Sequence, residues 1–560
     1  MQINDQLAKI GISGLLKYLN PRTAELLDYF GILENSTPKK IANILLLSIG
    51  SETILRNKKI RESLLDTFRP NEIKKLSKLI SKKEYTNYYK YLKKLKFSRN
   101  SKELTIIKEY FELNKENIET KVLEDFETLK LIKKPKDQSE VFSLYPLFKH
   151  QIKASNKCIK LLKSSKPRVF LHMPTGSGKT RTAINIMCTL LREKTNNFVI
   201  VWLANKEELC DQAYEEFFKA WQIIGNQTVK IFKHFGGKRS NLNEIANYVE
   251  NNSAVIFSSL DMMYEDLTNN ISSVMLLSKY TGLVVMDEAH LTVAKTYKNI
   301  IKNLAPTDET GILGLSATPG RSYRNVDEDL ELKNFYFSQK VGLEVEGEKN
   351  IINWLVKNKF LAKAKMERIE FEADLAKLFS KNDLDKELVR INEGKDYSKS
   401  FRDKISNNNE RVDLIINLIK EESKKNEKMI VFSSSKNNAI AIADILNING
   451  IYSASITSDT DPELRRDLIN KFKDKKSKLN ILVNYDVLTT GFDAPKTKTA
   501  IISRPTTSIV LYHQMIGRVV RGEKQGGNKA AKVLTVVDTY LPGYKNLADS
   551  FYFWEDIWNE

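Results

Sequence analysis

A glycine-rich segment, MPTGSGKT at residues 173–180, combines residue types that bind phosphate. It follows the apolar run VFLH and precedes the helix-like run AINIMCTLL. Gly176 and Gly178 have no Cβ, so backbone N–H groups can approach phosphate oxygens, and the positive end of the following helix points at the same anion. We expect ATP with Mg²⁺ here, with Lys179 on the β- and γ-phosphates and Thr180 on the metal. The predicted cofactor-binding residues of this loop are Thr175, Gly176, Ser177, Gly178, Lys179 and Thr180.

A second motif, VVMDEAH at residues 284–290, is an apolar run that ends in two acids. Asp287, at the end of a strand, could hold Mg²⁺, and Glu288 could polarise an attacking water. Taken alone, an Asp-Glu pair after a strand is more often a solvated loop. Its position behind the glycine-rich segment favours catalysis, so we predict Lys179, Asp287 and Glu288 as catalytic residues and Asp287 as a metal ligand.

A third motif, YHQMIGRVVRG at residues 512–522, carries two arginines three positions apart. On a helix, Arg518 and Arg521 would share one face, and both guanidinium groups could meet one triphosphate. Taken alone, such a pair more often lies on a solvated helix face. Because the pair follows the two motifs above in order, we predict both arginines as catalytic. They belong to a different part of the chain, so ATP would be fully contacted only when the two parts close.

The elements that position these motifs follow from apolar periodicity. The N-terminal quarter has helical spacing, and Pro21, Pro38 and Pro70 stand where helices would begin. From about Tyr145 onward, short β-branched runs alternate with helical segments, which predicts parallel sheets with crossover helices. The expected strands are RVFLHM, FVIVWL, SAVIFSS, GLVVMDE and GILGLSA in a first series, and MIVFSS, IYSASIT, LNILVN, TAIISR and KVLTVVD in a second.

The predicted fold class is therefore α/β, with two tandem parallel-sheet domains preceded by an all-helical N-terminal domain. We expect a helical accessory domain at residues 1–140, an ATP-binding domain at 141–325, a connecting segment at 326–410 and a second α/β domain at 411–560. Within the connecting segment, KDYSKSFRDKISNNNE at residues 395–410 is strongly polar. We expect this stretch to bury little surface and to be mobile or partly disordered.

Composition adds limits on partners and location. The 560 residues carry 89 Lys and Arg against 70 Asp and Glu, a net charge of +19 that favours a polyanionic partner, although a lysine-rich solvated surface gives the same charge. Cys158, Cys188 and Cys210 have neither disulfide nor zinc spacing. No apolar run approaches the roughly 20 residues of a membrane span, and the N-terminus lacks an export signal. We expect a cytoplasmic protein without a membrane partner.

With these motifs in place, residues 145–540 resemble the superfamily 2 helicases of DEAH type, and among them the motor subunits of type III restriction enzymes and bacterial DNA-repair helicases. The resemblance implies two RecA-like domains. Five further segments carry it, namely YPLFKHQ, VWLANKEELCDQA, GLSATPGR, NYDVLTTGFDAP and IVFSSS. By resemblance, the first places Gln151 at the adenine, the fourth places Gly491 and Asp493 near the nucleotide, and the nucleic-acid or coupling residues are Lys206, His290, Ser316, Thr318, Thr489 and Gln514.

Two positions depart from the usual pattern of the family. Met173 stands where the general phosphate-loop pattern has glycine, although MPTGSGKT as a whole resembles the superfamily 2 variant. Lys206 stands where many relatives carry arginine.

The resemblance implies an ATP-dependent helicase or translocase. Nucleic-acid-stimulated ATP hydrolysis would drive translocation on, or unwinding or remodelling of, DNA, with RNA less favoured, in DNA repair, restriction or phage defence. The alternative is an ATP-gated nucleic-acid sensor or clamp that signals through the helical N-terminal domain without processive unwinding. A protein partner, a nuclease or other effector, is expected to act through residues 1–140.

One N-terminal stretch, KKLSKLISKKEYTNYYKYLKKLKF at residues 74–97, interleaves lysines with tyrosines. The mixture suits phosphate contact with base stacking. A solvated amphipathic helix is the favoured interpretation.

Overall fold

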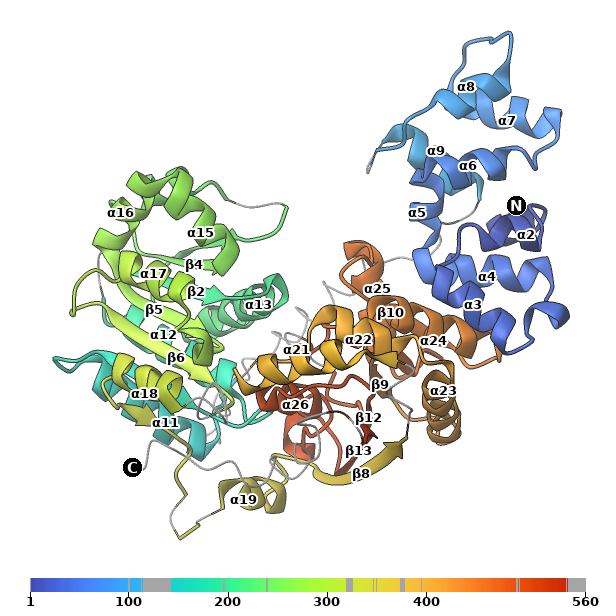
Figure 1. Cartoon of the computed structure of the whole chain (residues 1–560). Coiled ribbons are helices and arrows are strands. Elements are labelled where there is room, and N and C mark those ends of the chain that lie inside the picture. The colour runs from blue at the N-terminus through green and yellow to red at the C-terminus, as the bar shows by residue number, and fades with distance from the viewer. Residues whose placement is uncertain are drawn as a thin grey trace, which may run out of the picture. The chain divides into compact units, whose positions relative to one another are not determined.

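A computed structural model describes residues 2–98, 101–111, 113, 143–194, 197–237, 240–318, 326–345, 347–348, 350–372, 378–393, 395–489, 492, 494–539 and 541. Figure 1 shows the arrangement of helices and strands within each part of the chain. By compactness, the chain divides into two units, Met1–Val141 with Asp403–Val487 and Phe142–Arg402 with Leu488–Glu560.

The N-terminal region is helical, which confirms the prediction over the described residues up to 111. Pro21, Pro38 and Pro70 are the first residues of α3, α4 and α7, where the missing N–H of proline costs no hydrogen bond. The helices are α1 (Ile3–Ala8), α2 (Ile12–Leu16), α3 (Pro21–Tyr29), α4 (Pro38–Ile49), α5 (Ser51–Arg56), α6 (Lys58–Leu65), α7 (Pro70–Ile80), α8 (Tyr88–Lys94) and α9 (Lys102–Tyr110). The stretch 74–97 is thus two helices joined by a turn and not one amphipathic helix.

A buried hydrogen-bond network joins the N-terminal helices to α24 (Lys436–Ile448) within the same compact unit. Asp444 of α24 is 1% exposed, and its two carboxylate oxygens accept from Thr23 Oγ1 of α3, at 2.6 Å, and from the hydroxyl of Ser48 on α4. Asn20 Nδ2 donates to Asn437 Oδ1 at 3.0 Å. Helices α3 and α4 are therefore fixed to α24 through a carboxylate that is almost fully buried.

The first sheet has seven strands in the order β3-β4-β2-β5-β6-β1-β7, and every pair is parallel. Strands β2, β4 and β6 are buried along their whole length, as expected for a parallel sheet covered on both faces. The strands are β1 (Arg168–His172), β2 (Val199–Ala204), β3 (Lys230–His234), β4 (Ala254–Ser259), β5 (Thr281–Asp287), β6 (Gly311–Ser316) and β7 (Lys340–Val341).

Helices cross between these strands and enclose an apolar core. Residues of β2, β4 and β5, such as Val201, Ile256 and Val284, pack with Leu277 of α16 and Ile300 of α17. The helices are α11 (Lys149–Leu162), α12 (Lys179–Arg192), α13 (Glu207–Ile224), α14 (Leu242–Val249), α15 (Leu260–Asn269), α16 (Ile271–Tyr280), α17 (Lys295–Leu304) and α18 (Val326–Phe335). All five strands predicted for this domain are present.

The second sheet has six strands in the order β10-β11-β9-β12-β13-β8. They are β8 (Lys363–Phe371), β9 (Met429–Phe432), β10 (Ser453–Ile456), β11 (Ile481–Asn484), β12 (Thr499–Ile502) and β13 (Ala530–Asp538), and the five predicted strands of this series are all among them. The accompanying helices are α19 (Ile351–Lys357), α21 (Lys381–Asn392), α22 (Lys399–Ser406), α23 (Asn409–Ser423), α24, α25 (Pro462–Lys473) and α26 (Ile509–Ile516). The chain thus contains two parallel-sheet RecA-like domains, as predicted.

The expectation of disorder at residues 395–410 is wrong. This stretch includes α22 and the first two residues of α23, and it buries Tyr397, Phe401 and Ile405 to 3% exposure or less. The ring of Phe401 stacks on Phe379 at 4.1 Å between centroids. Polar residues separate these three apolar positions, which nevertheless recur at the i, i+4, i+8 spacing of an amphipathic helix.

Among the helices that the structure describes, none combines the length and the apolarity that a bilayer span requires.

Candidate nucleotide-binding site

The glycine-rich loop lies between β1, which ends at His172, and α12, which begins at Lys179. Gly176 and Gly178 have φ of +82° and +91°, in the left-handed region that side chains disfavour. A Cβ on Gly178 would lie 2.0 Å from Gln151 Nε2. The loop therefore turns as a phosphate-binding loop does and delivers backbone N–H groups to the N-terminus of α12.

Gln151 holds this loop in place. Its Nε2 donates to Ser177 O at 3.0 Å, and its Oε1 accepts from Phe148 N at 2.9 Å, with the side chain 1% exposed. Both ends of the amide are therefore engaged by the protein itself. The contact of Gln151 with adenine remains a prediction.

Lys179 meets both predicted acids at the end of β5. Its Nζ lies 3.1 Å from Asp287 Oδ1 and 3.8 Å from Glu288 Oε1. Burial alone lowers the pKa of Lys179, but the charges of Asp287 and Glu288 more than offset burial, so the pKa is raised. Burial raises the pKa of Asp287, against the opposing charge of Lys179. The three side chains form one buried charged group in which a single cation serves two carboxylates.

Glu288 has an unusual backbone conformation. Its φ is +54°, which in a residue other than glycine costs of the order of 1–3 kcal/mol. The N–H of Glu288 donates to its neighbour Asp287 Oδ1 at 3.0 Å. The sharp turn after β5 directs consecutive acid side chains toward the same lysine.

A chain of buried polar contacts leads from Glu288 to the end of β6. His290 Nδ1 lies 3.4 Å from Glu288 Oε2 and 3.4 Å from Ser316 Oγ, and Ser316 Oγ lies 3.2 Å from Thr318 Oγ1. The structure thus joins three of the predicted coupling residues, His290, Ser316 and Thr318, to the predicted catalytic acid. A change at Ser316 reaches Glu288 through two contacts, and a change at Thr318 reaches it through three.

The two predicted arginines do not share a helix face, so that part of the reasoning is wrong. Helix α26 ends at Ile516, Arg518 lies in the following turn, and Arg521 pairs with Leu361 in an antiparallel bridge. Both arginines nevertheless adjoin the loop. A Cβ built on Gly176 would lie 3.7 Å from Arg521 Cγ, and the charge of Arg518 opposes protonation of Lys179 in the balance that sets its pKa.

Tight packing accounts for this proximity. Gly517, just before Arg518, leaves no room for a side chain, because its Cβ would lie 2.1 Å from Thr175 Cγ2 of the loop. Arg518 Nη1 donates to Phe492 O at 2.7 Å, and its Nε donates to Gln514 O at 3.1 Å. Two backbone carbonyl oxygens therefore hold the guanidinium group of Arg518 in place.

Some of the remaining predicted site residues lie in the described part of the chain, and others lie outside it. Lys206 directly precedes α13, and its pKa is lowered by burial, with Arg504 and Arg518 adding to the effect of burial. Thr489 is 2% exposed. Gly491 and Asp493 lie outside the described residues, and Thr180 follows Lys179 in the first turn of α12.

Sequence reasoning missed a cluster at the end of β12. Asp396 Oδ1 accepts from Thr507 N at 2.7 Å, and Asp396 Oδ2 lies 3.8 Å from both Arg402 and Arg504. Because the charge of Arg504 lowers the pKa of Lys206, this cluster belongs to the same electrostatic environment. The available signal was SRPTTS directly after an apolar strand, since polar residues at the carboxyl ends of parallel strands mark ligand sites.

The donor set suits Mg²⁺ bound together with phosphate. Among the residues that the structure describes, no three His, Cys, Asp or Glu side chains gather as a metal cage. Thr180 and Asp287 offer one hydroxyl and one carboxylate, and Mg²⁺ is usually held by one or two such protein oxygens with phosphate and water completing its shell. The carboxylates of Asp287 and Glu288 share one lysine, so a bound metal cation would further stabilise their negative charge.

Two family models match the chain. That of the type III restriction enzyme res subunit matches residues 144–321, and that of the helicase conserved C-terminal domain matches residues 410–523. Together they span about half of the chain, and they contain the loop, both acids and both arginines.

Curated relatives carry descriptions that agree with these models. A putative ATP-dependent helicase of Saccharomyces cerevisiae, IRC3, is 26% identical over 66% of this chain and 49% of that protein. The endonuclease subunit of the type I restriction enzyme EcoAI of Escherichia coli is 26% identical over 68% of this chain and 44% of that protein. The structure of the Type ISP restriction-modification enzyme LlaBIII bound to DNA has a TM-score of 0.49 at 16% identity, covering 75% of this chain and 29% of that one.

The chain spans about half the length of the curated relatives that it matches. Its two matched domains, in the order and with the motifs described above, identify it as a superfamily 2 helicase that resembles the res subunits of restriction enzymes.

Proposed function

We propose that the protein is an ATPase motor that nucleic acid stimulates, and that it moves along, unwinds or remodels DNA, with RNA the less favoured track. The observation that supports this most directly is the contact of Lys179 with Asp287 and Glu288 beside a loop whose Gly176 adjoins Arg521. Every charged group that hydrolysis of a triphosphate requires is present within one compact unit.

In the proposed reaction, Lys179 and the loop N–H groups bind the phosphates, while Thr180 and Asp287 hold the metal. Bound Mg²⁺ would neutralise charge on the β- and γ-phosphate oxygens. Glu288 orients and deprotonates the attacking water, and its strained backbone keeps its carboxylate near Lys179. Arg518 and Arg521 stabilise negative charge that develops in the transition state.

We further propose that strand binding reaches the site through His290, Ser316 and Thr318. These residues connect the end of β6 to Glu288 by contacts of 3.2–3.4 Å. Such a chain would let a strand bound near Thr318 alter the position of the catalytic acid. Hydrolysis would then be slow until nucleic acid is bound.

The biological setting that we propose is DNA repair, restriction or phage defence in the cytoplasm. The relatives named above include a restriction-enzyme subunit, which supports restriction or phage defence as a setting. A separate nuclease or effector, bound to the N-terminal helices, would supply strand cleavage if it occurs.

The test is steady-state ATP hydrolysis by the wild type and by Glu288→Gln, without nucleic acid and with single-stranded DNA, duplex DNA and RNA. We expect strong stimulation of the wild type by one polymer and loss of turnover in Glu288→Gln. Glu309→Gln, which removes an exposed carboxylate from the same domain, is the matched control and should behave as wild type. Hydrolysis that no polymer changes would contradict a nucleic-acid motor.

A second candidate is an ATP-gated sensor or clamp that signals through the N-terminal helices. The buried contacts of Thr23 and Ser48 with Asp444 favour it, because they tie those helices rigidly to α24 of the second sheet. Displacement of a labelled strand during ATP hydrolysis distinguishes the two. A motor displaces the strand, whereas a clamp binds in an ATP-dependent way and displaces nothing.

A further inference from the structure

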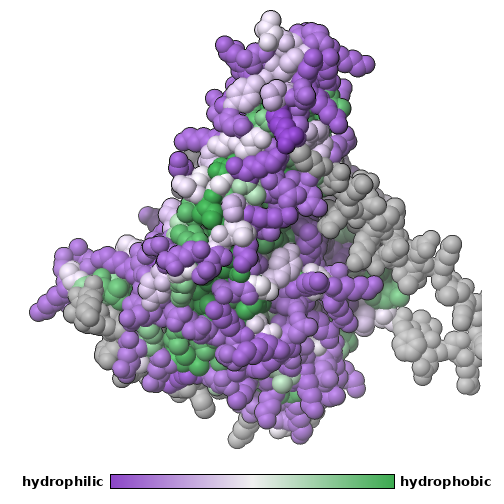
Figure 2. Space-filling model, turned by 90° about the vertical axis from the view of Figure 1, so that its right-hand side faces the viewer, coloured by the Kyte–Doolittle hydropathy of each residue, from purple (hydrophilic) through white to green (hydrophobic). Residues whose placement is uncertain are grey.

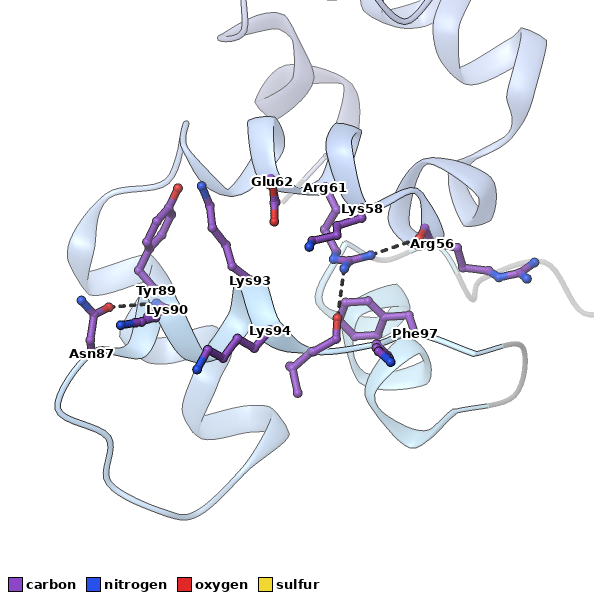
Figure 3. A pocket seen from close by; sticks show the side chains of 12 residues that line it. Arg56, Lys58, Arg61, Glu62, Asn87, Tyr89, Lys90, Lys93, Lys94 and Phe97 are labelled. Atoms are coloured by element: carbon purple, nitrogen blue, oxygen red, sulfur yellow. Dashed lines mark hydrogen bonds between the residues drawn. The ribbon is translucent and has the colours of Figure 1, made fainter.

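The N-terminal helices enclose a strongly basic pocket that the ATP site does not involve. Its volume is about 750 Å³, and it lies between the end of α5, the start of α6, and α8 with the segment that follows it. Seven of its twelve lining residues are lysine or arginine, against a single acid, Glu62. We name it the α6–α8 pocket (Figure 3).

A buried arginine builds this pocket. Arg61 is 4% exposed, and its guanidinium donates to Leu55 O at 2.9 Å, to Arg56 O at 3.1 Å and to Leu95 O at 2.9 Å. It also lies over the ring of Phe97, 4.6 Å from the centroid. These contacts tie the segment after α8 to the end of α5 and fix the walls of the pocket (Figure 3).

Arg61 also keeps an unused donor. Its Nε–H is buried and finds no acceptor among the residues that the structure describes. Burial lowers the pKa of Arg61, while Glu62 raises it. A buried guanidinium with an unmet N–H is a costly arrangement, and its positive charge adds to that of the lysines around the pocket.

Most other cations of the pocket have no acidic partner nearby. Lys58, Lys90, Lys94 and Lys96 are exposed, and none pairs with an acid within the described part of the chain. Lys93 is the exception, with Asp66 at 3.1 Å and the ring of Tyr89 at 4.5 Å. The pocket therefore carries a large uncompensated positive charge, which attracts anions.

The basic surface extends beyond the pocket, which favours a polymer over a small anion. Residues 74–97 contain nine lysines and one glutamate, Glu84, which pairs with Lys78 at 2.7 Å. Figure 2 shows a mainly hydrophilic surface over α7 and α8, at the top of the view. A single small phosphate compound would use the pocket alone, whereas a strand could also follow the lysines along α7.

We propose that the α6–α8 pocket binds backbone phosphates of the nucleic-acid strand on which the motor acts, as an anchor separate from the ATP site. This inference rests on the proposed function, because it takes the bound polymer to be the motor's own track. The anchor adds affinity without reading sequence, since phosphate contacts carry no base information.

The test measures binding of a labelled single-stranded oligonucleotide to the full-length protein by fluorescence anisotropy at several salt concentrations, without ATP. The variant is Lys90→Gln combined with Lys94→Gln and Lys96→Gln, whose exposed side chains leave the fold intact. Each lost phosphate contact lowers the slope of log affinity against log salt by about 0.7 for a single strand, so the three together lower it by about 2. At 0.1 M salt, we expect binding roughly 100-fold weaker.

The matched control removes three exposed lysines of the same unit that do not line the pocket, Lys473, Lys475 and Lys476, by substitution with glutamine. It should keep most of the affinity and slope. The pocket variant should also hydrolyse ATP at the wild-type maximal rate at saturating polymer, with a higher half-stimulating concentration. This readout separates the anchor from the proposed function, because Glu288→Gln loses the maximal rate itself.

Two results would overturn the proposal. The first is a pocket variant that binds with the affinity and salt slope of the control. The second is displacement of the strand from the wild type by stoichiometric tripolyphosphate, which would assign the pocket to a small polyphosphate. Failure of every polymer to stimulate hydrolysis, with strand binding still lost in the pocket variant, would refute the motor and leave the phosphate site standing.

Discussion

Asp444 gives the stability prediction that is easiest to test, because it is an acid buried at 1% exposure whose partners among the described residues are two hydroxyl groups, those of Thr23 and Ser48. Burial raises its pKa to about 7, and the two hydrogen bonds offset this only in part. The perturbation is Asp444→Asn, which has nearly the same shape and cannot ionise. Asn can accept from one hydroxyl and donate to the other, so the contacts with α3 and α4 are retained.

The magnitude follows from proton linkage. The folded pKa of about 7 lies above the ordinary value of 3.8, so between these values the folded protein holds a proton that the unfolded chain has lost. The free energy of unfolding therefore falls as pH rises from about 4 to about 7, and it is constant above that. At about 1.4 kcal/mol per pH unit, the loss amounts to roughly 4 kcal/mol.

The assay is urea unfolding at pH 5 and pH 8, followed by far-UV circular dichroism. Trp202, Trp221 and Trp354 lie in the unit Phe142–Arg402 with Leu488–Glu560, so tryptophan fluorescence follows that unit while circular dichroism follows the whole chain. At pH 8, we expect Asp444→Asn to unfold at higher urea than the wild type in the dichroism signal. At pH 5 the order should be equal or reversed.

Glu421→Gln is the matched control, because it neutralises an exposed acid that pairs with Lys424 on nearby α23. It should keep the wild-type pH profile. An Asp444→Asn variant destabilised by the same amount at both pH values would refute the reasoning, since it would mean that Asp444 is already ionised in the folded protein.

Two further predictions concern the ATP site. Gly178→Ala should lower the melting temperature and abolish ATP binding, because its Cβ would lie 2.0 Å from Gln151 Nε2 at a φ of +91°. The control is Gly237→Ala, whose Cβ would meet no atom within 4 Å. This control should leave the melting temperature in calorimetry and the affinity in nucleotide titration unchanged. Arg521→Lys should lower kcat by about 10³-fold or more with little change in KM for ATP, since lysine lacks the planar fork. Arg466→Lys, at an exposed arginine of α25, is its control, and an unchanged kcat in Arg521→Lys would remove Arg521 from the catalytic group.

The central strands and the edge strand β10 were predictable, whereas the edge strands β3, β7 and β8 were not. Strands β2 and β4 are apolar along their length because both faces are covered, so their sequences stand out. Strand β8, at the edge of the second sheet, reads KAKMERIEF and is never fully buried. An edge strand needs charged residues to avoid pairing with other chains, and those residues hide it from a search for apolar runs.

The site shows the same division between local and long-range information. The loop and the acids were found because each needs only a strand, a turn and a helix in sequence. The convergence of Arg518 and Arg521 was predicted for the wrong reason, since α26 ends at Ile516 and packing of Gly517 against Thr175 brings the arginines to the loop. Ser48 and Thr23, the hydrogen-bond partners of Asp444, lie 396 and 421 positions away in the sequence, so no local sequence pattern predicts them.

Because Lys179 pairs with two carboxylates, the residue substituted to make an inactive variant has to be chosen with care. Substituting Lys179 leaves Asp287 and Glu288 adjacent, buried and without their cation, and breaking a buried ion pair in this way typically costs about 3–5 kcal/mol. Such a variant would lose folding and hydrolysis together, and its phenotype in cells would report on abundance as much as on chemistry. Glu288→Gln removes one of the two repelling charges and keeps the pair of Lys179 with Asp287, so it is the variant whose inactivity can be attributed to the lost base.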